Sequence, residues 1–171
     1  MSEIDAQLFR RAAARFATGV TVVTTRTDDG PFGMTANSFT TVSLDPRLIL
    51  VCVGERARIR EHLLRTGTFA VTVLSAGQQD AARRFADPAR PAGAAAFADD
   101  AWAPGPATGN PVLLDGSAWF DCAVHDVHAA GDHSIVVGEV RALSPLDAEQ
   151  PLLFAGGRFL TAVRPALEVS A

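Results

Sequence analysis

The sequence contains no tyrosine and no lysine, and it has only two cysteines and no long apolar run. Without tyrosine, no phenolic hydroxyl can donate a proton in a reaction. No apolar run is long enough to span a bilayer. The first residues, 1–5, have neither the basic nor the apolar part of a signal peptide, so we expect neither secretion nor membrane insertion.

The two cysteines and the net charge narrow the classes of protein further. Cys52 and Cys122 do not form a Cys-x-x-Cys pair, and we expect both to be reduced, buried thiols of a cytoplasmic protein, although counting alone leaves a disulfide open. The formal net charge of −4 argues against nucleic acid as a partner, because binding to phosphate backbones relies on a basic surface.

The length of 171 residues, 48% of them hydrophobic, suits one domain over residues 1–171 with an ample core. Apolar residues at Ile4, Leu8, Ala12 and Phe16 predict an amphipathic N-terminal helix that ends before Gly19 and packs on a sheet. The remaining pattern predicts strands at 20–25, from 32 onward, and at 48–53, 69–74, 117–127, 134–142 and 152–163. We expect the strand at 48–53 to be buried on both faces. Helices are predicted at 56–66 and 78–86, and residues 87–111 are expected to form a long surface loop with a helical turn near 94–97.

Many short strands, few helices and no alternation of strands with helices favour a mainly β protein, namely an antiparallel barrel. No Gly-x-Gly-x-x-Gly follows a strand, which argues against a Rossmann domain.

The stretch of residues 33–46 mixes strand formers with small hydroxyl and amide side chains. Gly33 and Ala36 lack bulk, so a planar ligand could approach the main chain. Its hydrogen-bonding partners would be Thr35, Asn37, Ser38 and Thr40. This profile is typical of a cofactor cradle, and the alternative is an edge strand whose exposed face is rich in Thr and Ser.

Four possible zinc ligands crowd the last third of the chain: Cys122, His125, His128 and His133. Within one strand, Cys122 and His128 would face one way and His125 the other, which disfavours a shared metal. His133 stands in the Gly131-Asp132-His133 connection between two strands, where it either projects over a pocket or is a plain turn residue.

Arginines mark a possible anion site after the strand at 48–53. Arg56, Arg58 and Arg60 open the next helix, where guanidinium groups and backbone N–H groups favour a phosphate, and solvent exposure explains at least two of them equally well. Arg83 and Arg84 raise the same question, and Arg158 beside Gly156-Gly157 could meet a second anionic group. No nucleophile arrangement and no paired carboxylates stand out.

Taken together, the chain resembles the short-chain flavin reductase family over nearly its whole length. The segments that carry the resemblance are Phe16-Ala17-Thr18-Gly19-Val20-Thr21-Val22-Val23-Thr24, Gly33-Met34-Thr35-Ala36-Asn37-Ser38-Phe39, Val42-Ser43-Leu44-Asp45-Pro46, Phe69-Ala70-Val71-Thr72-Val73-Leu74, and Gly131-Asp132-His133 leading to Val137-Gly138-Glu139-Val140. The chain departs from the family pattern at Thr72, where Asn is frequent, and at Arg47, where a second proline is frequent.

The resemblance implies an FMN-binding split barrel, a homodimer with the flavin between subunits, and hydride transfer from NADH or NADPH to FMN or FAD. Residues implied to hold the flavin are Thr35, Ala36, Asn37 and Ser38 along the ring and ribityl chain, Cys52, Val53 and Arg58 toward the phosphate, and Arg84 and Phe85 near its far end. His133, Arg158 and Phe159 are implied to border the nicotinamide nucleotide, with His133 as the orienting catalytic group and no metal.

We therefore expect an NAD(P)H:flavin oxidoreductase that supplies reduced flavin to a partner monooxygenase. The alternatives are a non-catalytic flavin-binding protein of the same barrel, and a metal-binding module built on the cluster of Cys122 and the three histidines that follow it.

Overall fold

Antiparallel strands form most of the regular structure in this computed structural model, which describes residues 5–147 and 150–162. The strands are β1 (Thr18–Gly19), β2 (Thr21–Thr27), β3 (Gly30–Ala36), β4 (Thr40–Leu44), β5 (Arg47–Gly54), β6 (Thr68–Val73), β7 (Trp102–Pro104), β8 (Pro111–Leu113), β9 (Ala118–Ala130), β10 (His133–Pro145), β11 (Leu152–Ala155) and β12 (Arg158–Thr161). The helices are α1 (Ala6–Ala13), α2 (Arg58–Thr66) and α3 (Gln79–Ala86), with 3₁₀ turns at Ala76–Gln78 and Gly93–Phe97.

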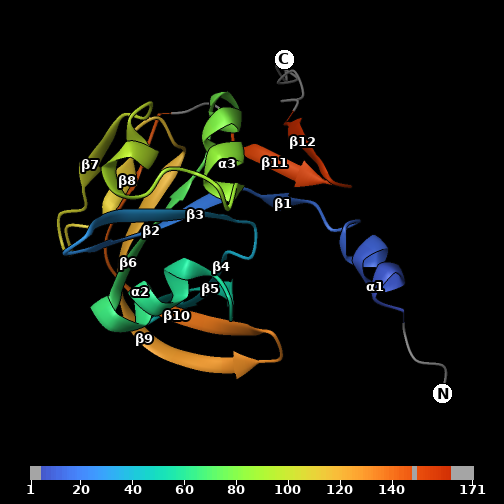
Figure 1. The fold of residues 1–171 in the computed structure, drawn as a ribbon, viewed down its shortest axis with the longest axis horizontal. Coiled ribbons are helices and arrows are strands. Elements are labelled where there is room, and N and C mark those ends of the chain that lie inside the picture. Colours follow the sequence, from blue (N-terminus) through green and yellow to red (C-terminus); the bar gives the residue numbers. More distant parts are fainter. Residues whose placement is uncertain (1–4, 148–149, 163–171) are drawn as a thin grey trace, which may run out of the picture.

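Seven of these strands form one sheet in the order β3-β2-β6-β9-β10-β5-β4, with every neighbouring pair antiparallel. The sheet curls until β3 approaches β5, with α2 and α3 packed against it (Figure 1). β1, β11 and β12 form a small separate sheet beside α3. The chain is thus a mainly β, antiparallel split barrel, and the predicted fold class is confirmed.

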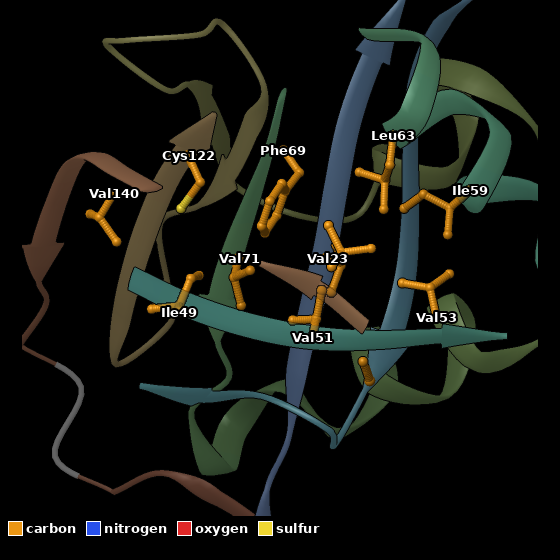
Figure 2. Close-up of a cluster of buried hydrophobic side chains, with 12 residues drawn as sticks. Val23, Ile49, Val51, Val53, Ile59, Leu63, Phe69, Val71, Cys122 and Val140 are labelled. Carbon is orange, nitrogen blue, oxygen red and sulfur yellow. The ribbon is translucent and has the colours of Figure 1, made fainter. Parts of the chain in front are cut away.

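The core inside the barrel comes from one face of each strand. Figure 2 shows Val23, Ile49, Val51 and Phe69 converging from β2, β5 and β6, with Ile59 and Leu63 of α2 added from the side. A second cluster, which includes Phe85 and Phe97, fills the space between the sheet and α3. Burial of such side chains contributes about 1.5–3 kcal/mol each, which makes these faces the main source of stability.

β5 differs from the prediction of a strand buried on both faces. Ile49, Val51 and Val53 are buried in the barrel, whereas Leu50 and Cys52 between them remain partly exposed. The reason is that β5 is antiparallel and has no helix over its outer face, so only one face is covered within this chain.

The N-terminal helix forms over Ala6–Ala13 as predicted, with Asp5 accepting a hydrogen bond from the Gln7 amide as its N-cap, but it does not bury any residue on a sheet. Figure 1 shows α1 standing to one side of the barrel, and Phe9 is 67% exposed. The predicted first apolar position, Ile4, lies outside the described residues.

The later elements mostly follow the prediction with shifted limits. β9 and β10 are longer than predicted, because only Gly131 and Asp132 form the turn between them. The segment 87–111 is not confined to the surface, since Phe97 is buried and packs on Phe85 and Trp102. The expected last strand is instead the hairpin β11–β12, which turns at Gly156-Gly157, both at positive φ; Val163 lies outside the described residues.

Among the residues that the structure describes, no helix combines the length and the hydropathy required to cross a membrane.

Candidate functional site

A cavity of about 200 Å³ opens between β3, α3 and the β11–β12 hairpin. We call it the apolar hollow, because most of the surface that lines it is carbon. Its lining residues are Val20, Thr35, Ala36, Asn37, Ala82, Ala86, Phe154 and Phe159. The end of β3 and the small residues of α3 form part of this lining, and the rings of Phe154 on β11 and Phe159 on β12 complete it.

Small side chains and one hydroxyl set the width of the apolar hollow. Ala82 and Ala86 are four residues apart on α3 and so share one face of the helix. Thr35 Oγ1 donates to the carbonyl oxygen of Ala82 at 2.7 Å, which fixes α3 against β3. The main role of the Thr35 hydroxyl is thus to connect β3 to α3, and its oxygen can still accept one hydrogen bond from a ligand.

A second cavity of about 320 Å³ adjoins the first, since Thr35 and Ala86 line both. We call it the arginine hollow; it is lined by Met34, Thr35, Arg56, Ala57, Arg58, Ile59, Phe85, Ala86, Pro88 and Arg90. Its lining contains three guanidinium groups and no carboxylate.

The positive charge in the arginine hollow is concentrated rather than neutralised. Arg58 donates to the carbonyl oxygen of Pro88 at 3.0 Å and Arg90 to that of Asp87 at 2.8 Å, and neither forms an ion pair within the described part of the chain. Burial, and then the nearby charge of Arg58, lower the pKa of Arg90, and the charge of Asp87 opposes them with a smaller effect. An anion in this hollow would relieve the repulsion between these groups.

The start of α2 adds to this preference for an anion. Ala57 is the N-cap residue and provides no side-chain hydrogen bond to the first turn. Alanine is a poor N-cap, so the first amides of α2 are left for water or for a ligand in the hollow.

Ser38 connects the segment of residues 33–46 to Cys52 of β5. Ser38 Oγ accepts from the Cys52 amide at 3.0 Å and donates to the Cys52 carbonyl at 3.1 Å. Val53 next to them points into the core and is fully buried, so only its backbone can face a ligand.

His133 lies outside the lining of both hollows. It pairs with Gly54 of β5, and its ring lies over that glycine. Strand alternation places it on the same outer face as Cys52, about 7 Å along the sheet. Asp132 Oδ1 is 2.7 Å from His133 Nδ1, and this hydrogen bond, together with the charge of a protonated ring, lowers the pKa of Asp132.

The other predicted site residues separate into two groups. Phe85 and Phe159 line the arginine hollow and the apolar hollow respectively, and Arg158 is exposed beside Phe159. Arg84 faces away from both, where Asp99, Asp100 and the carbonyl oxygen of Ala96 bind its guanidinium group.

Several lining residues were not predicted from the sequence: Ala82, Ala86, Phe154 and Arg90. The spacing of two small residues by four on a helix was the available signal for the alanines. Arg90 carried no signal, because its place depends on how residues 87–93 turn back over β3. Arg83, which the sequence marked together with Arg84 as a possible anion-site residue, lies over the Phe159 ring at 5.4 Å.

Within residues 5–147 and 150–162, no three metal-binding side chains come together. Cys122 lies in the barrel core, away from the exposed His125, His128 and His133. The metal-binding alternative thus has no assembled site in the described chain.

An antiparallel split barrel whose apolar hollow continues into an arginine-lined one defines a protein of the nucleotide-cofactor-binding class. The chain belongs to the flavin reductase like domain family, which it matches over residues 13–162, and it is a flavin reductase.

Three similar proteins illustrate this membership. The NADH-dependent FAD reductase of Streptomyces globisporus is 46% identical over 155 residues, which cover 91% of this chain and 85% of that protein. The flavin-dependent monooxygenase reductase subunit HsaB of Rhodococcus jostii is 38% identical over 98% of this chain and 83% of its own length. The crystal structure of BorF, the flavin reductase component of a bacterial two-component tryptophan halogenase, superimposes with a TM-score of 0.89 at 43% identity, covering 94% of this chain and all of BorF.

Proposed function

We propose that this chain transfers hydride from NADH to FAD or FMN and releases the reduced flavin to a separate monooxygenase. One observation carries the assignment of the site: an apolar hollow and an arginine hollow that meet at Thr35 and Ala86. A flavin nucleotide has the same two parts, a flat apolar ring system and an anionic phosphate, in the same order.

The residues present fit this ligand. The small side chains of Ala36, Ala82 and Ala86 let a ring approach the main chain of β3, and Asn37 offers an exposed carboxamide to its edge. Arg56, Arg58 and Arg90 would bind the phosphate, with the open amides at the start of α2. Ser38 binds both the amide and the carbonyl of Cys52, so Cys52 would border the flavin with its partly exposed side chain, and the Ser38 bonds position this part of β5. Val53, whose side chain is buried in the core, would border the flavin only with its main chain.

We assign His133, Arg158 and Phe159 to the nicotinamide nucleotide; within one chain His133 begins β10 beside β5, apart from Arg158 and Phe159 in the β11–β12 hairpin (Figure 1). Asp132 binds His133 Nδ1, which leaves Nε2 directed away from Asp132 and available for a ligand hydrogen bond. Because such a contact orients the donor, His133→Ala should raise the KM for NADH more than it lowers kcat. A fall in kcat of several orders with an unchanged KM would contradict the assignment.

The protein supplies placement rather than acid or base groups. When bound, the flavin itself accepts the hydride and needs no nucleophile from the chain. Phe154 and Phe159 exclude water from the apolar hollow, and backbone amides of residues 35–38 can stabilise negative charge that develops on the ring edge. The absence of tyrosine and of paired carboxylates is consistent with this division of labour.

The functional unit is proposed to be a cytoplasmic homodimer of one flavin reductase domain per chain, residues 1–171. Exposed apolar residues on α1 and on β4, among them Phe9, Val42 and Leu44, support a second copy as the missing cover. The monooxygenase partner is proposed because HsaB is the reductase subunit of a flavin-dependent monooxygenase, and BorF likewise is the flavin reductase component of a two-component halogenase.

Oxidation of NADH by the purified protein, with FMN or FAD added and oxygen removed, tests the function. We expect NADH absorbance to fall only when flavin is present, and flavin absorbance to bleach in parallel. Parallel assays with NADPH and with each flavin define the preferred pair.

Tight flavin binding without NADH oxidation would overturn the reductase assignment and leave the non-catalytic flavin-binding protein. If FMN and riboflavin bind with equal affinity, the phosphate site in the arginine hollow is wrong even if the enzyme turns over.

A further inference from the structure

A closed set of three side chains lies behind the arginine hollow, on the inner side of the barrel. Ser134 Oγ of β10 donates to Glu55 Oε1 at 2.7 Å and accepts from Arg60 Nε at 3.0 Å. The Arg60 guanidinium group also lies 3.2 Å from Glu55 Oε2. Ser134 is only 1% exposed, whereas the Arg60 and Glu55 side chains that bind it are 28% and 39% exposed.

This set holds one short piece of chain at both ends. Glu55 and Arg60 flank residues 56–59, which carry Arg56, Ala57 and Arg58 of the hollow lining. The Glu55 amide also donates to the carbonyl oxygen of Asp132 at 2.9 Å, so the same corner is fixed to the turn before β10. The buried Ser134 hydroxyl is therefore the side-chain contact that ties both ends of this piece to β10, beside the Glu55 amide and the core packing of Ile59.

The set also distributes charge in favour of a ligand. Arg60 uses its guanidinium group on Glu55 and Ser134. Glu55, the acidic residue immediately before Arg56, is thereby engaged with Arg60, and the charges of Arg56 and Arg58 stay available to an anion.

We propose that Ser134, Glu55 and Arg60 are positioning residues for phosphate recognition, acting through Arg56 and Arg58 without touching the ligand. This inference rests on the proposed binding of the flavin phosphate in the arginine hollow. Its consequence is selective: loss of the set should weaken binding of flavins that carry a phosphate and spare riboflavin, which lacks one.

The test is the dissociation constant of FMN and of riboflavin, measured by flavin fluorescence without NADH. Ser134→Ala should raise the Kd for FMN about tenfold and change that for riboflavin less than about twofold. In an Arg58→Ala background the same change should add little, because the positioned group is already gone. Thr72→Val is the matched control, since it removes another fully buried strand hydroxyl, one that accepts from the Leu113 amide, outside this corner.

If Ser134→Ala does not fold, Glu55→Gln is used instead. The Glu55 side chain is 39% exposed, and glutamine has nearly the same volume as glutamate. If the wild type binds FMN more tightly than riboflavin and both variants keep this full preference, the inference is overturned and the proposed function stands. An equal loss of preference in Thr72→Val also overturns it, since general loosening would then be the cause. Wild-type protein without any preference for FMN refutes the phosphate site itself.

Discussion

The two cysteines differ sharply in environment. Burial, followed by the charge of Asp121, raises the pKa of Cys122 to about 12, so its thiolate is scarce at neutral pH. Cys52 is partly exposed on the outer face of β5, next to the Ser38 hydroxyl.

We predict that iodoacetamide alkylates native protein at Cys52 and leaves Cys122 unmodified, and that saturating FMN slows the reaction. Mass spectrometry of tryptic peptides locates the label, and Cys52→Ser provides the unlabelled control. Modification of Cys122 in folded protein would contradict the environment described, and an FMN-independent rate would place the flavin away from Cys52.

Gly33 shows how closely β3 and α3 approach one another. A Cβ built at Gly33 would lie 2.6 Å from Phe85 Cε1. Phe85 is fully buried and lines the arginine hollow, so its ring has little room to move. We predict that Gly33→Ala destabilises the fold by about 1–3 kcal/mol and weakens flavin binding, because the ring must shift. Gly19→Ala, which meets no atom within 4 Å, is the control; equal stability of the two variants in urea unfolding would refute this packing.

At the scale of elements, one buried carboxylate organises the loop before β8. Asp121 of β9 is fully buried and accepts hydrogen bonds from the Ala107 and Thr108 amides and from the Thr108 hydroxyl. Asn110, beside it, accepts from the Arg26 amide and so links the loop to β2.

Asp121→Asn should lower the free energy of unfolding by about 3 kcal/mol, because an amide N–H would then face backbone donors. Amide hydrogen exchange at Ala107 and Thr108 should accelerate as well. Asp80→Asn, at a 94% exposed side chain, should change stability by less than about 1 kcal/mol. Unchanged exchange at both amides in Asp121→Asn would show that the carboxylate does not hold the loop.

His62 of α2 makes the stability of the fold depend on pH. The imidazole stacks on Phe32 at a centroid distance of 3.9 Å, and burial, then the charge of Arg65, lower its pKa below 6.5. The unfolded chain therefore binds this proton more tightly, and stability falls as the pH drops from above 6.5 through the native pKa.

We predict a smaller loss of stability between about pH 8 and pH 5 for His62→Gln than for wild type, measured by urea unfolding at each pH. The comparison uses the slope of the free energy of unfolding against pH, because the loss of the stacking contact lowers the stability of His62→Gln by the same amount at every pH. The same slope in both proteins would show that His62 titrates normally.

The sequence was sufficient for elements whose pattern is local. The helix predicted to end at residue 66 does so, before Gly67 at positive φ, and Asp28-Asp29 makes the turn between the first two predicted strands. It failed where an outcome depends on distant partners. The apolar run in β5 does not tell whether its outer face is covered, and Arg90 reaches the site only through the path of the loop at 87–111.

The same distinction applies to the site. Thr35, Ala36 and Asn37 share one segment, so the sequence could group them, and they do line one hollow. Arg84 and its neighbour Phe85 are equally plausible from the sequence. Only the rotation of α3 decides that Phe85 lines the hollow while Arg84 binds Asp99 and Asp100.

At the scale of the whole molecule, apolar surface is left where one chain provides no cover. α1 exposes Leu8 and Phe9, β4 exposes Val42 and Leu44, and the outer face of β5 is only partly covered. An amphipathic helix with no buried residue gains little stability from its own chain, so its formation argues for a second surface on which it packs.

We predict that the wild-type protein sediments as a dimer and that Leu44→Asp shifts it toward monomer with loss of flavin reductase activity. Leu44 is 91% exposed, so a charge there should alter the stability of an isolated chain by less than about 0.5 kcal/mol and act only where a partner covers it. Leu114→Asp, at a 45% exposed position between β8 and β9, should leave the dimer intact. Sedimentation of the wild type as a fully active monomer would refute the proposal, because the exposed faces of α1 and β4 would then have no role in catalysis.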